Sequence, residues 1–332
     1  RRHAAHHSGD SDGGRGRHES THAEAGDRAA AHAHAKGHAP RSEGKARESK
    51  ARHEERHAAA AAAGLADNSS CNCLATKMIL LPAEFPALAD RFCAAFRRAV
   101  AATRPEPAWY PGMRERYEKW RESVTRAGAT VEVLDAAPPK AVGALASGEH
   151  AALPFALADL GTVSADDAGR LDRAFADVAW TREEPFAPVC CILRVGGATL
   201  EAYAAAAFAL ADRQLWGNLS CAVYAPDAAV PLALRAAADK TLRYGAVGIN
   251  TPTFLCYKPA GYWGGPRGVN SLADAQSGVG NVCNMLMLDS ARSCAVVCKF
   301  DQAPPGQLPI GAWGSKLLCR LICLGWRGLL PW

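Results

Sequence analysis

Residues 68–77 read Asn68-Ser69-Ser70-Cys71-Asn72-Cys73-Leu74-Ala75-Thr76-Lys77 and lead directly into the apolar run Met78-Ile79-Leu80-Leu81. A short uninterrupted apolar run is typical of a buried strand. Two cysteines therefore lie in a loop at the entrance of a strand, where backbone N–H groups favour a thiolate and solvent has access. Such a thiolate is suited to nucleophilic catalysis.

Strand and helix patterns alternate along the rest of the chain. We predict strands over residues 77–81, 130–134, 189–195, 219–224 and 246–250, and helices over 85–103, 113–126, 198–212 and 229–244. Alternation of this kind is typical of parallel strands joined by crossover helices. The predicted fold class is therefore α/β, with a mostly parallel sheet flanked by helices. The segment 251–280, rich in Gly, Pro, Trp and Tyr, is longer than an ordinary connection and indicates a functional loop.

The first 64 residues have a different composition from the rest of the chain. They contain no Val, Ile, Leu, Met, Phe, Trp, Tyr or Cys, so we predict a disordered tail. The tail holds ten of the eleven His residues and +3 of the net charge of +5. Interspersed acids and missing aromatics disfavour nucleic-acid binding, and without Cys it completes no cysteine-containing zinc site. Binding of a metal or of nucleic acid by this tail is a hypothesis for the chain's function, weaker than the two that are derived below from residues 65–300.

We divide the chain into the disordered His/Ala/Arg-rich tail (1–64), one main domain (65–300) and an apolar C-terminal extension (301–332). The extension carries interspersed cations, and we expect it to pack on the domain or a sister subunit rather than on a membrane surface. Twelve cysteines without a regular spacing indicate reduced thiols and a cytoplasmic protein. No run approaches the roughly 18 to 20 apolar residues that span a bilayer.

A second group of motifs lies downstream of the cysteines. Residues 181–189 read Thr-Arg-Glu-Glu-Pro-Phe-Ala-Pro-Val, which places an acidic pair, an aromatic residue and a proline just before a strand. Three further segments, 212–220, 244–251 with 263–265, and 274–289, follow in order. Taken singly, each also fits an ordinary turn or helix end.

Taken together and in order, these segments resemble the aldehyde dehydrogenase family from residue 68 to about residue 300. The family's nucleophile motif has an Asn five residues before the catalytic Cys and an Ala two residues after it, which makes Cys73 the nucleophile and leaves Cys71 as the alternative. Ser70 stands where the family usually has Gly. Residues 181–189 resemble the family element E-E-x-F-G-P, which implies that Glu184 hydrogen-bonds the ribose beside the nicotinamide and that Phe186 packs near it.

The resemblance implies oxidation of an aldehyde to a carboxylic acid through a thiohemiacetal and a thioester on Cys73, with NAD or NADP as hydride acceptor, no metal ion, and a homo-oligomeric protein. The Cys73 backbone amide is an expected oxyanion donor. The family's base, its side-chain oxyanion donor and its cofactor-binding domain all precede the nucleophile, where this chain has only the tail. We therefore expect an incomplete enzyme that is inactive as this chain alone. The alternative is a degenerate, non-catalytic domain that acts as an interaction or oligomerisation module.

Overall fold

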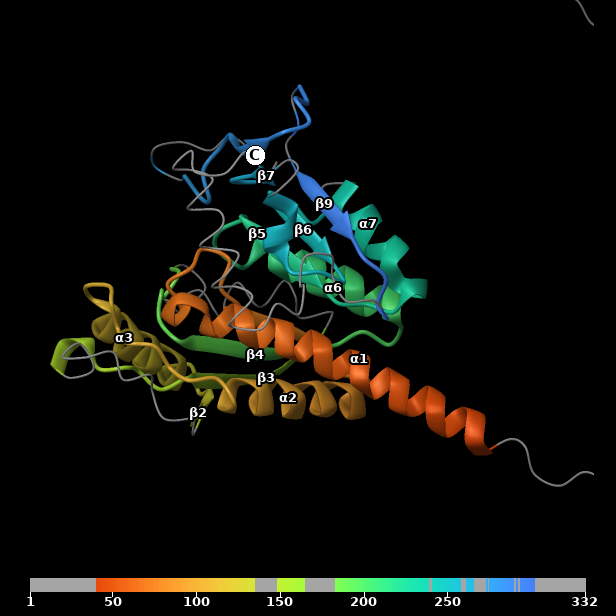
Figure 1. Ribbon diagram of the computed structural model, residues 1–332, viewed down its shortest axis with the longest axis horizontal. Coiled ribbons are helices and arrows are strands. Elements are labelled where there is room, and N and C mark those ends of the chain that lie inside the picture. Colours follow the sequence, from red (N-terminus) through yellow and green to blue (C-terminus); the bar gives the residue numbers. More distant parts are fainter. Residues whose placement is uncertain are drawn as a thin grey trace, which may run out of the picture. The chain divides into compact units, whose positions relative to one another are not determined.

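The computed structural model describes residues 40–134, 148–164, 183–238, 241–257, 261–265, 273, 275–289, 291 and 293–301. The predicted C-terminal extension, apart from Asp301, and residues 1–39 of the predicted tail lie outside this part of the chain. The described residues form an α/β structure with mostly parallel strands (Figure 1). None of the described helices is both long and apolar enough to cross a membrane.

The larger sheet contains four strands in the order β1-β4-β3-β2. They are β1 (Met78–Pro82), β2 (Thr130–Val133), β3 (Ala156–Val163) and β4 (Val189–Val195). β4 runs parallel to both of its neighbours, whereas the edge strand β2 is antiparallel to β3. The nearly continuous apolar sequence of β4 is typical of a central strand that is buried on both faces.

Helices cover both faces of this sheet. Cys190 and Ile192 of β4 pack with α2 (Pro86–Ala101), while the intervening Cys191 packs with α3 (Met113–Arg126). This division follows from the strand period of two, which sends successive side chains to opposite faces. The neighbouring β3 follows the same rule, since Leu157 faces the α2 side and Ala156 and Ala158 the α3 side.

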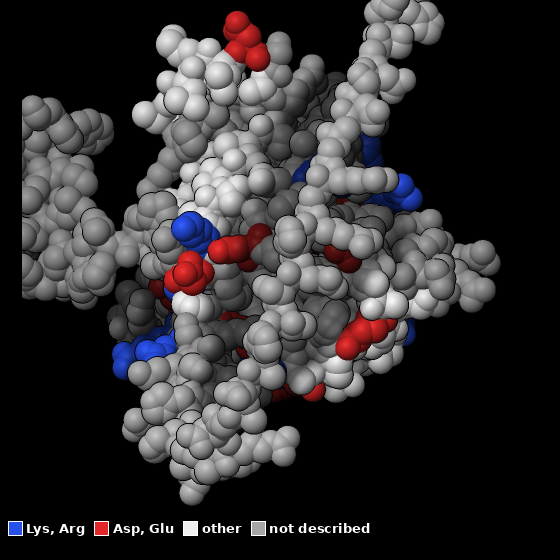
Figure 2. Space-filling model, turned by 90° about the vertical axis from the view of Figure 1, so that its right-hand side faces the viewer, with Lys and Arg blue, Asp and Glu red and all other residues white. Residues whose placement is uncertain are grey.

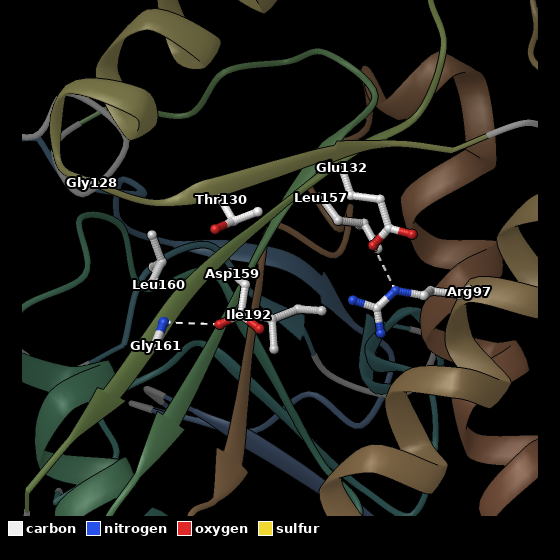
Figure 3. Close-up of a pocket in the computed structure, with 9 residues that line it drawn as sticks. All are labelled: Arg97, Gly128, Thr130, Glu132, Leu157, Asp159, Leu160, Gly161 and Ile192. Atoms are coloured by element: carbon white, nitrogen blue, oxygen red, sulfur yellow. Dashed lines mark hydrogen bonds and ion pairs between the residues drawn. The ribbon is translucent and has the colours of Figure 1, made fainter.

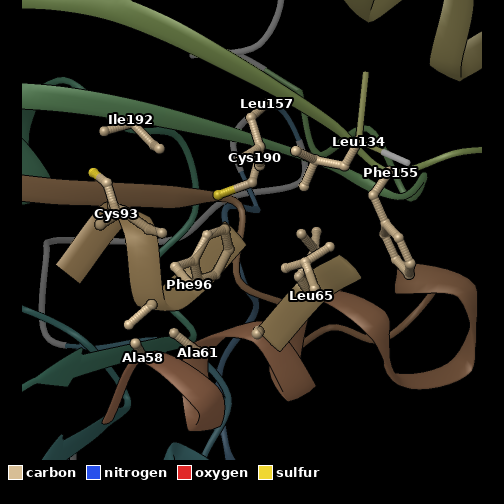
Figure 4. Close-up of a cluster of buried hydrophobic side chains, with 14 of the residues drawn as sticks. Ala58, Ala61, Leu65, Cys93, Phe96, Leu134, Phe155, Leu157, Cys190 and Ile192 are labelled. Atoms are coloured by element: carbon tan, nitrogen blue, oxygen red, sulfur yellow. The ribbon is translucent and has the colours of Figure 1, made fainter. Parts of the chain in front are cut away.

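The end of the predicted tail is helical, which corrects the boundary at residue 64. Residues Pro40–Ala66 form α1. Its last turns pack two alanines and a leucine against α2, as Figure 4 shows for Ala58, Ala61 and Leu65 beside Phe96. On the same helix, His57 is buried between the rings of Tyr224 and Phe300. The prediction failed because it required large apolar residues, whereas alanine is the best helix former and buries its methyl group without loss of side-chain entropy.

A pair of neighbouring alanines tests this packing. Ala62 is 1 % exposed and faces the core, whereas Ala63 on the same helix is exposed. Both Ala→Ser changes lose the same small helix propensity, but only Ala62→Ser also buries a hydroxyl group. We expect Ala62→Ser to lower the free energy of unfolding by about 1 kcal/mol more than Ala63→Ser, measured by urea unfolding. Equal losses for the two variants would show that α1 does not pack on α2.

A second, smaller parallel sheet has the order β5-β6-β9. Its strands are β5 (Ser220–Val223), β6 (Ala246–Ile249) and β9 (Cys294–Val297). Helix α6 (Leu200–Arg213) links the two sheets, because it contributes Ala206 and Leu210 to the core beside β4 and Ala211 to the core of the second sheet. Helix α7 (Val230–Ala238) covers the second sheet, and β7 (Gly261–Tyr262) pairs with β8 (Asn281–Asn284) in an antiparallel ribbon.

Four short 3-10 helices complete the described elements: η1 (Asp67–Ser70), η3 (Gly148–His150), η5 (Asp227–Ala229) and η6 (Thr253–Cys256). The predicted strands and helices listed above are all present, with shifted ends and a shorter α7. Strand β3 and the strands after residue 260 are absent from the predicted set. The small residues of β3 explain the omission, because Ala, Gly and Thr in its sequence weaken the alternating pattern that identifies a strand.

Candidate functional site

The loop that carries the two cysteines has an unusual backbone. Asn68, Ser69 and Ser70 have consecutive positive φ angles of 53°, 54° and 62°. Non-glycine residues pay about 1 kcal/mol or more for this left-handed conformation, so surrounding contacts must hold it. The Ser69 hydroxyl donates to the Pro107 carbonyl at 2.9 Å, and Asn68 Nδ2 donates to Tyr110 Oη at 2.9 Å. Glycine adopts a positive φ without steric cost, whereas Ser70 adopts it here only with strain.

Asn72 shapes the turn around Cys73. Its Oδ1 accepts a hydrogen bond from the Leu74 backbone N–H at 2.9 Å, while its Nδ2 donates to Asp67 Oδ2 at 2.9 Å. A side chain that bonds the backbone two residues ahead forms an Asx turn. The Cys73 side chain on this turn is exposed, and its own backbone N–H acts to lower the pKa of the thiol. The thiol is therefore accessible and has a backbone donor beside it.

The fold brings the predicted second motif into contact with this loop. The Cys71 thiol donates to the Phe186 carbonyl at 3.1 Å. The Lys77 ammonium donates to the Ala187 carbonyl at 2.8 Å and to the Ser70 carbonyl and hydroxyl at 3.0 and 2.7 Å. Lys77 thus joins residues 70 and 187, which are far apart in the sequence, through a single side chain.

Helix α3 supports the second motif from the other side. Arg116 Nε donates to the Pro185 carbonyl at 3.1 Å, and its guanidinium also bonds the Pro111 carbonyl at 2.9 Å. Lys119 forms an exposed ion pair with Glu183 at 2.7 Å. Phe186 has a φ of 41°, a strained value that the Arg116 bond to Pro185 and the Cys71 bond to the Phe186 carbonyl help to maintain.

Burial dominates the electrostatics of the site. The surrounding protein partly desolvates the exposed Cys73 thiol and so raises its pKa, and the nearby Glu184 carboxylate raises it further. Burial also raises the pKa of Cys71, although Arg116 and Lys77 oppose this effect. Burial raises the pKa of Glu184, and Lys77 opposes it. The predicted preference for a thiolate at this loop is therefore not present in this arrangement, because no described cation outweighs the desolvation of Cys73.

Burial also shifts the pKa of the Lys77 ammonium. Burial lowers its pKa from 10.5 to about 8, with Glu184 and the nearby thiols opposing the change. Most molecules therefore carry a desolvated cation here at pH 7, held by the three oxygen acceptors named above. Hydrogen bonds from a charged donor are stronger than neutral ones, which suits a residue that fixes two loops together.

The three residues predicted for the site, Cys73, Glu184 and Phe186, lie on the two loops that meet here. Lys77, Arg116 and Tyr257 are missing from the sequence-based set. Tyr257 lies near Cys73, and burial raises its pKa, with Cys256 and Cys73 among the further causes. A cation directly before a buried strand is a signal that could have identified Lys77, whereas nothing in the sequence around Arg116 or Tyr257 indicates this neighbourhood.

A cavity of about 410 Å³ lies away from these loops, on the α2 side of the larger sheet (Figure 3). Its charged side chains already have partners, because Arg97 pairs with Glu132 at 2.7 Å and Arg194 with Asp159 at 2.9 Å. We therefore assign no ligand to it. On the face shown in Figure 2, the described basic and acidic side chains lie in small mixed groups rather than in one basic patch.

A comparison with solved structures found aldehyde dehydrogenases that are similar to part of this chain. Similar solved structures include a salicylaldehyde dehydrogenase from Pseudomonas putida G7 (TM-score 0.48, 20 % identity, 75 % of this chain and 44 % of that chain). A second is an NADP-dependent glyceraldehyde-3-phosphate dehydrogenase from Bacillus halodurans C-125 (TM-score 0.42, 22 % identity, 60 % of this chain and 36 % of that chain). A third is aldehyde dehydrogenase 21 from Physcomitrella patens (TM-score 0.44, 13 % identity, 65 % of this chain and 39 % of that chain).

The chain spans less than half the length of these three structures. No protein-family model matches the sequence. No curated protein matches it either.

Proposed function

We propose that this chain carries the catalytic part of an NAD(P)-dependent aldehyde dehydrogenase, with Cys73 as nucleophile. One observation carries the proposal. The two loops whose motifs resemble that family, more than a hundred residues apart, meet in the fold through Cys71 and Lys77. An accessible thiol is placed beside a half-buried carboxylate as a result.

The proposed chemistry begins with deprotonation of Cys73. Its sulfur attacks the aldehyde carbon, and negative charge develops on the aldehyde oxygen. The Cys73 backbone N–H, which lies beside the sulfur, would donate a hydrogen bond to that oxygen. Because the thiol pKa is raised, the attack requires loss of a proton that is favoured at alkaline pH.

The residues of the second loop fit one end of a nicotinamide dinucleotide. No described residue donates a hydrogen bond to the Glu184 carboxylate, which leaves its oxygens able to accept from the ribose hydroxyls, and Phe186 offers an aromatic surface two residues later. The nicotinamide, when bound, accepts the hydride. The fit covers only this end, because none of the described strands is followed by a G-x-G-x-x-G turn to hold the pyrophosphate. We therefore propose that this chain alone adds an aldehyde to Cys73 as the thiohemiacetal and accepts an acyl group from an activated ester, but does not transfer hydride to a dinucleotide.

Acyl transfer tests the proposal without a dinucleotide. The full chain is mixed with p-nitrophenyl acetate, and release of p-nitrophenolate is followed together with the intact mass. We expect rapid addition of one acetyl group, located by peptide mapping in the segment that contains Cys73. Aldehyde with NAD or NADP should give no reduced nicotinamide with this chain alone. Absence of rapid acetylation would contradict the nucleophile, whereas formation of reduced nicotinamide would contradict only the proposed incompleteness.

A further inference from the structure

Two cysteines outside the proposed nucleophile loop lie together at one end of the second sheet. Cys294 is the first residue of β9, and it stands opposite Ala246, the first residue of β6, in the parallel pairing. Cys256 is the last residue of η6, which follows β6 and packs against both β6 and β9. The sequence separates the two cysteines by a long loop, so only the tertiary structure brings them together.

The backbone after β6 turns back sharply to place Cys256 there. A Cβ added at Gly248 would lie 2.4 Å from the Thr251 carbonyl oxygen. The backbone at Thr251 can therefore come this close to β6 only because residue 248 has no side chain. Tyr257, the residue after Cys256, donates its hydroxyl to the Leu219 carbonyl at 3.0 Å. The same carbonyl accepts from the Ala246 N–H at 2.9 Å. The chain around Cys256 thus returns to the end of the sheet where Cys294 begins.

The two thiols are close enough that each shifts the other's pKa, but they differ in environment. Cys256 is fully buried, whereas Cys294 is partly exposed. The neighbouring Cys256 thiol lowers the pKa of Cys294 to about 7, whereas Cys294 and burial raise the pKa of Cys256. An accessible sulfur with thiolate character beside a second thiol is the arrangement found in oxidation-sensitive cysteine pairs.

We propose that Cys294 and Cys256 form an oxidisable dithiol that closes to a disulfide when the protein meets a hydroperoxide. The Cys294 thiolate attacks one peroxide oxygen, the O–O bond breaks, and the departing oxygen leaves as water after taking up a proton. The sulfur of Cys256 then attacks the resulting Cys294 sulfenic acid, losing its proton, and the S–O bond breaks to release a second water. Hydrogen peroxide is reduced by two electrons, and the two thiols supply them. This modification does not depend on the proposed role of Cys73.

Peptide mapping after oxidation tests the proposal on the full chain. The protein is treated with a few equivalents of hydrogen peroxide at pH 7.5, free thiols are blocked with N-ethylmaleimide, and the tryptic digest is examined with and without dithiothreitol. We expect a linked pair of peptides, one containing Cys256 and the other residues 293–299, which separates on reduction. Because residues 293–299 also contain Cys298, variants must identify the bonded sulfur.

The matched variants are Cys294→Ser and Cys298→Ser, which change the same strand region by one atom each. Cys294→Ser should abolish the link, while Cys298→Ser should leave its yield unchanged. Cys256→Ala should also abolish it, and circular dichroism of each variant confirms that the fold is retained. A link that survives in Cys294→Ser, or oxidation of Cys294 to sulfinic acid without any link to Cys256, would overturn the proposal.

Discussion

Replacing Cys73 by alanine is expected to eliminate the rapid acetylation of this protein by p-nitrophenyl acetate, while Cys71→Ala retains it. The physical reason is the difference in contacts of the two thiols. Cys73 is exposed on the Asx turn, whereas the Cys71 thiol is half-buried and donates to the Phe186 carbonyl. The variants are necessary because both cysteines fall in one tryptic peptide, residues 57–77. We expect the rapid rate to fall at least about 100-fold in Cys73→Ala, since the effect of removing a nucleophile is not compensated by its neighbours.

The pH dependence of the same reaction supplies an independent check. Burial and Glu184 raise the pKa of Cys73 above its ordinary value of 9.0, so the thiolate fraction still increases with pH at that point. The acetylation rate should therefore continue to rise through pH 9 rather than reach a plateau near neutrality. Glu184→Gln removes the negative charge and should shift the rise to lower pH. Rapid acetylation that persists in Cys73→Ala and disappears in Cys71→Ala would assign the nucleophile to Cys71 instead.

Lys77→Met is expected to change how the stability of the protein depends on pH. The pKa of Lys77 is about 8 in the folded protein against 10.5 for an ordinary lysine. Between these values the unfolded chain keeps the proton that the folded protein has lost, so the free energy of unfolding rises with pH across this window and is level below it. One pKa unit corresponds to about 1.4 kcal/mol, so the full rise is on the order of 3 kcal/mol.

The comparison requires the wild-type protein, Lys77→Met and a control variant. Urea unfolding at several values between pH 7.5 and 10.5 should show the wild type gaining stability relative to Lys77→Met as the pH increases. Lys119→Met is the control, because its ammonium is exposed and, within the described part of the chain, pairs with the exposed Glu183. Its stability should follow the wild type across the range. Parallel curves for wild type and Lys77→Met would mean that the Lys77 ammonium is not desolvated in the folded protein.

Loss of Lys77 also releases the two loops of the site. Methionine occupies a similar volume but cannot donate to the Ser70 and Ala187 oxygens, which leaves acceptors of the folded protein without their partner. A loop shift of about 1 Å is enough to reduce a reaction rate about 100-fold. At pH 7.5 we therefore expect slower acetylation of Cys73 in Lys77→Met and an unchanged rate in Lys119→Met.

Much of the fold could be predicted because strand burial leaves a local pattern. β1 and β4 are short apolar runs, and the helices that follow β1 and β4 carry their apolar residues at helical spacing or are rich in alanine. Strand β3 and helix α1 were not predicted, each for a different reason. β3 mixes small and polar residues with its apolar ones, and α1 buries alanines whose low hydrophobicity resembles that of a solvated helix.

Less of the candidate site could be predicted. The motifs indicated Cys73, Glu184 and Phe186 individually, but neither Arg116 nor Tyr257 belongs to any motif, and each reaches its place through α3 or through the return of η6 to the second sheet. The direction of the pKa shift of Cys73 could not be predicted from the sequence. It depends on how far the surrounding protein desolvates the thiol and on the Glu184 carboxylate, which comes near Cys73 only in the folded chain.

The alternation of strands and helices and the order of the motifs can be read from the sequence, because both depend on neighbours within a few residues. Three relations become visible only in the folded chain: the Cys73 loop meets the Glu184 loop, the Lys77 ammonium is desolvated between them, and Cys256 lies near Cys294. Those relations depend on long-range packing, and pKa values and thiol pairing are set by the surroundings that packing creates.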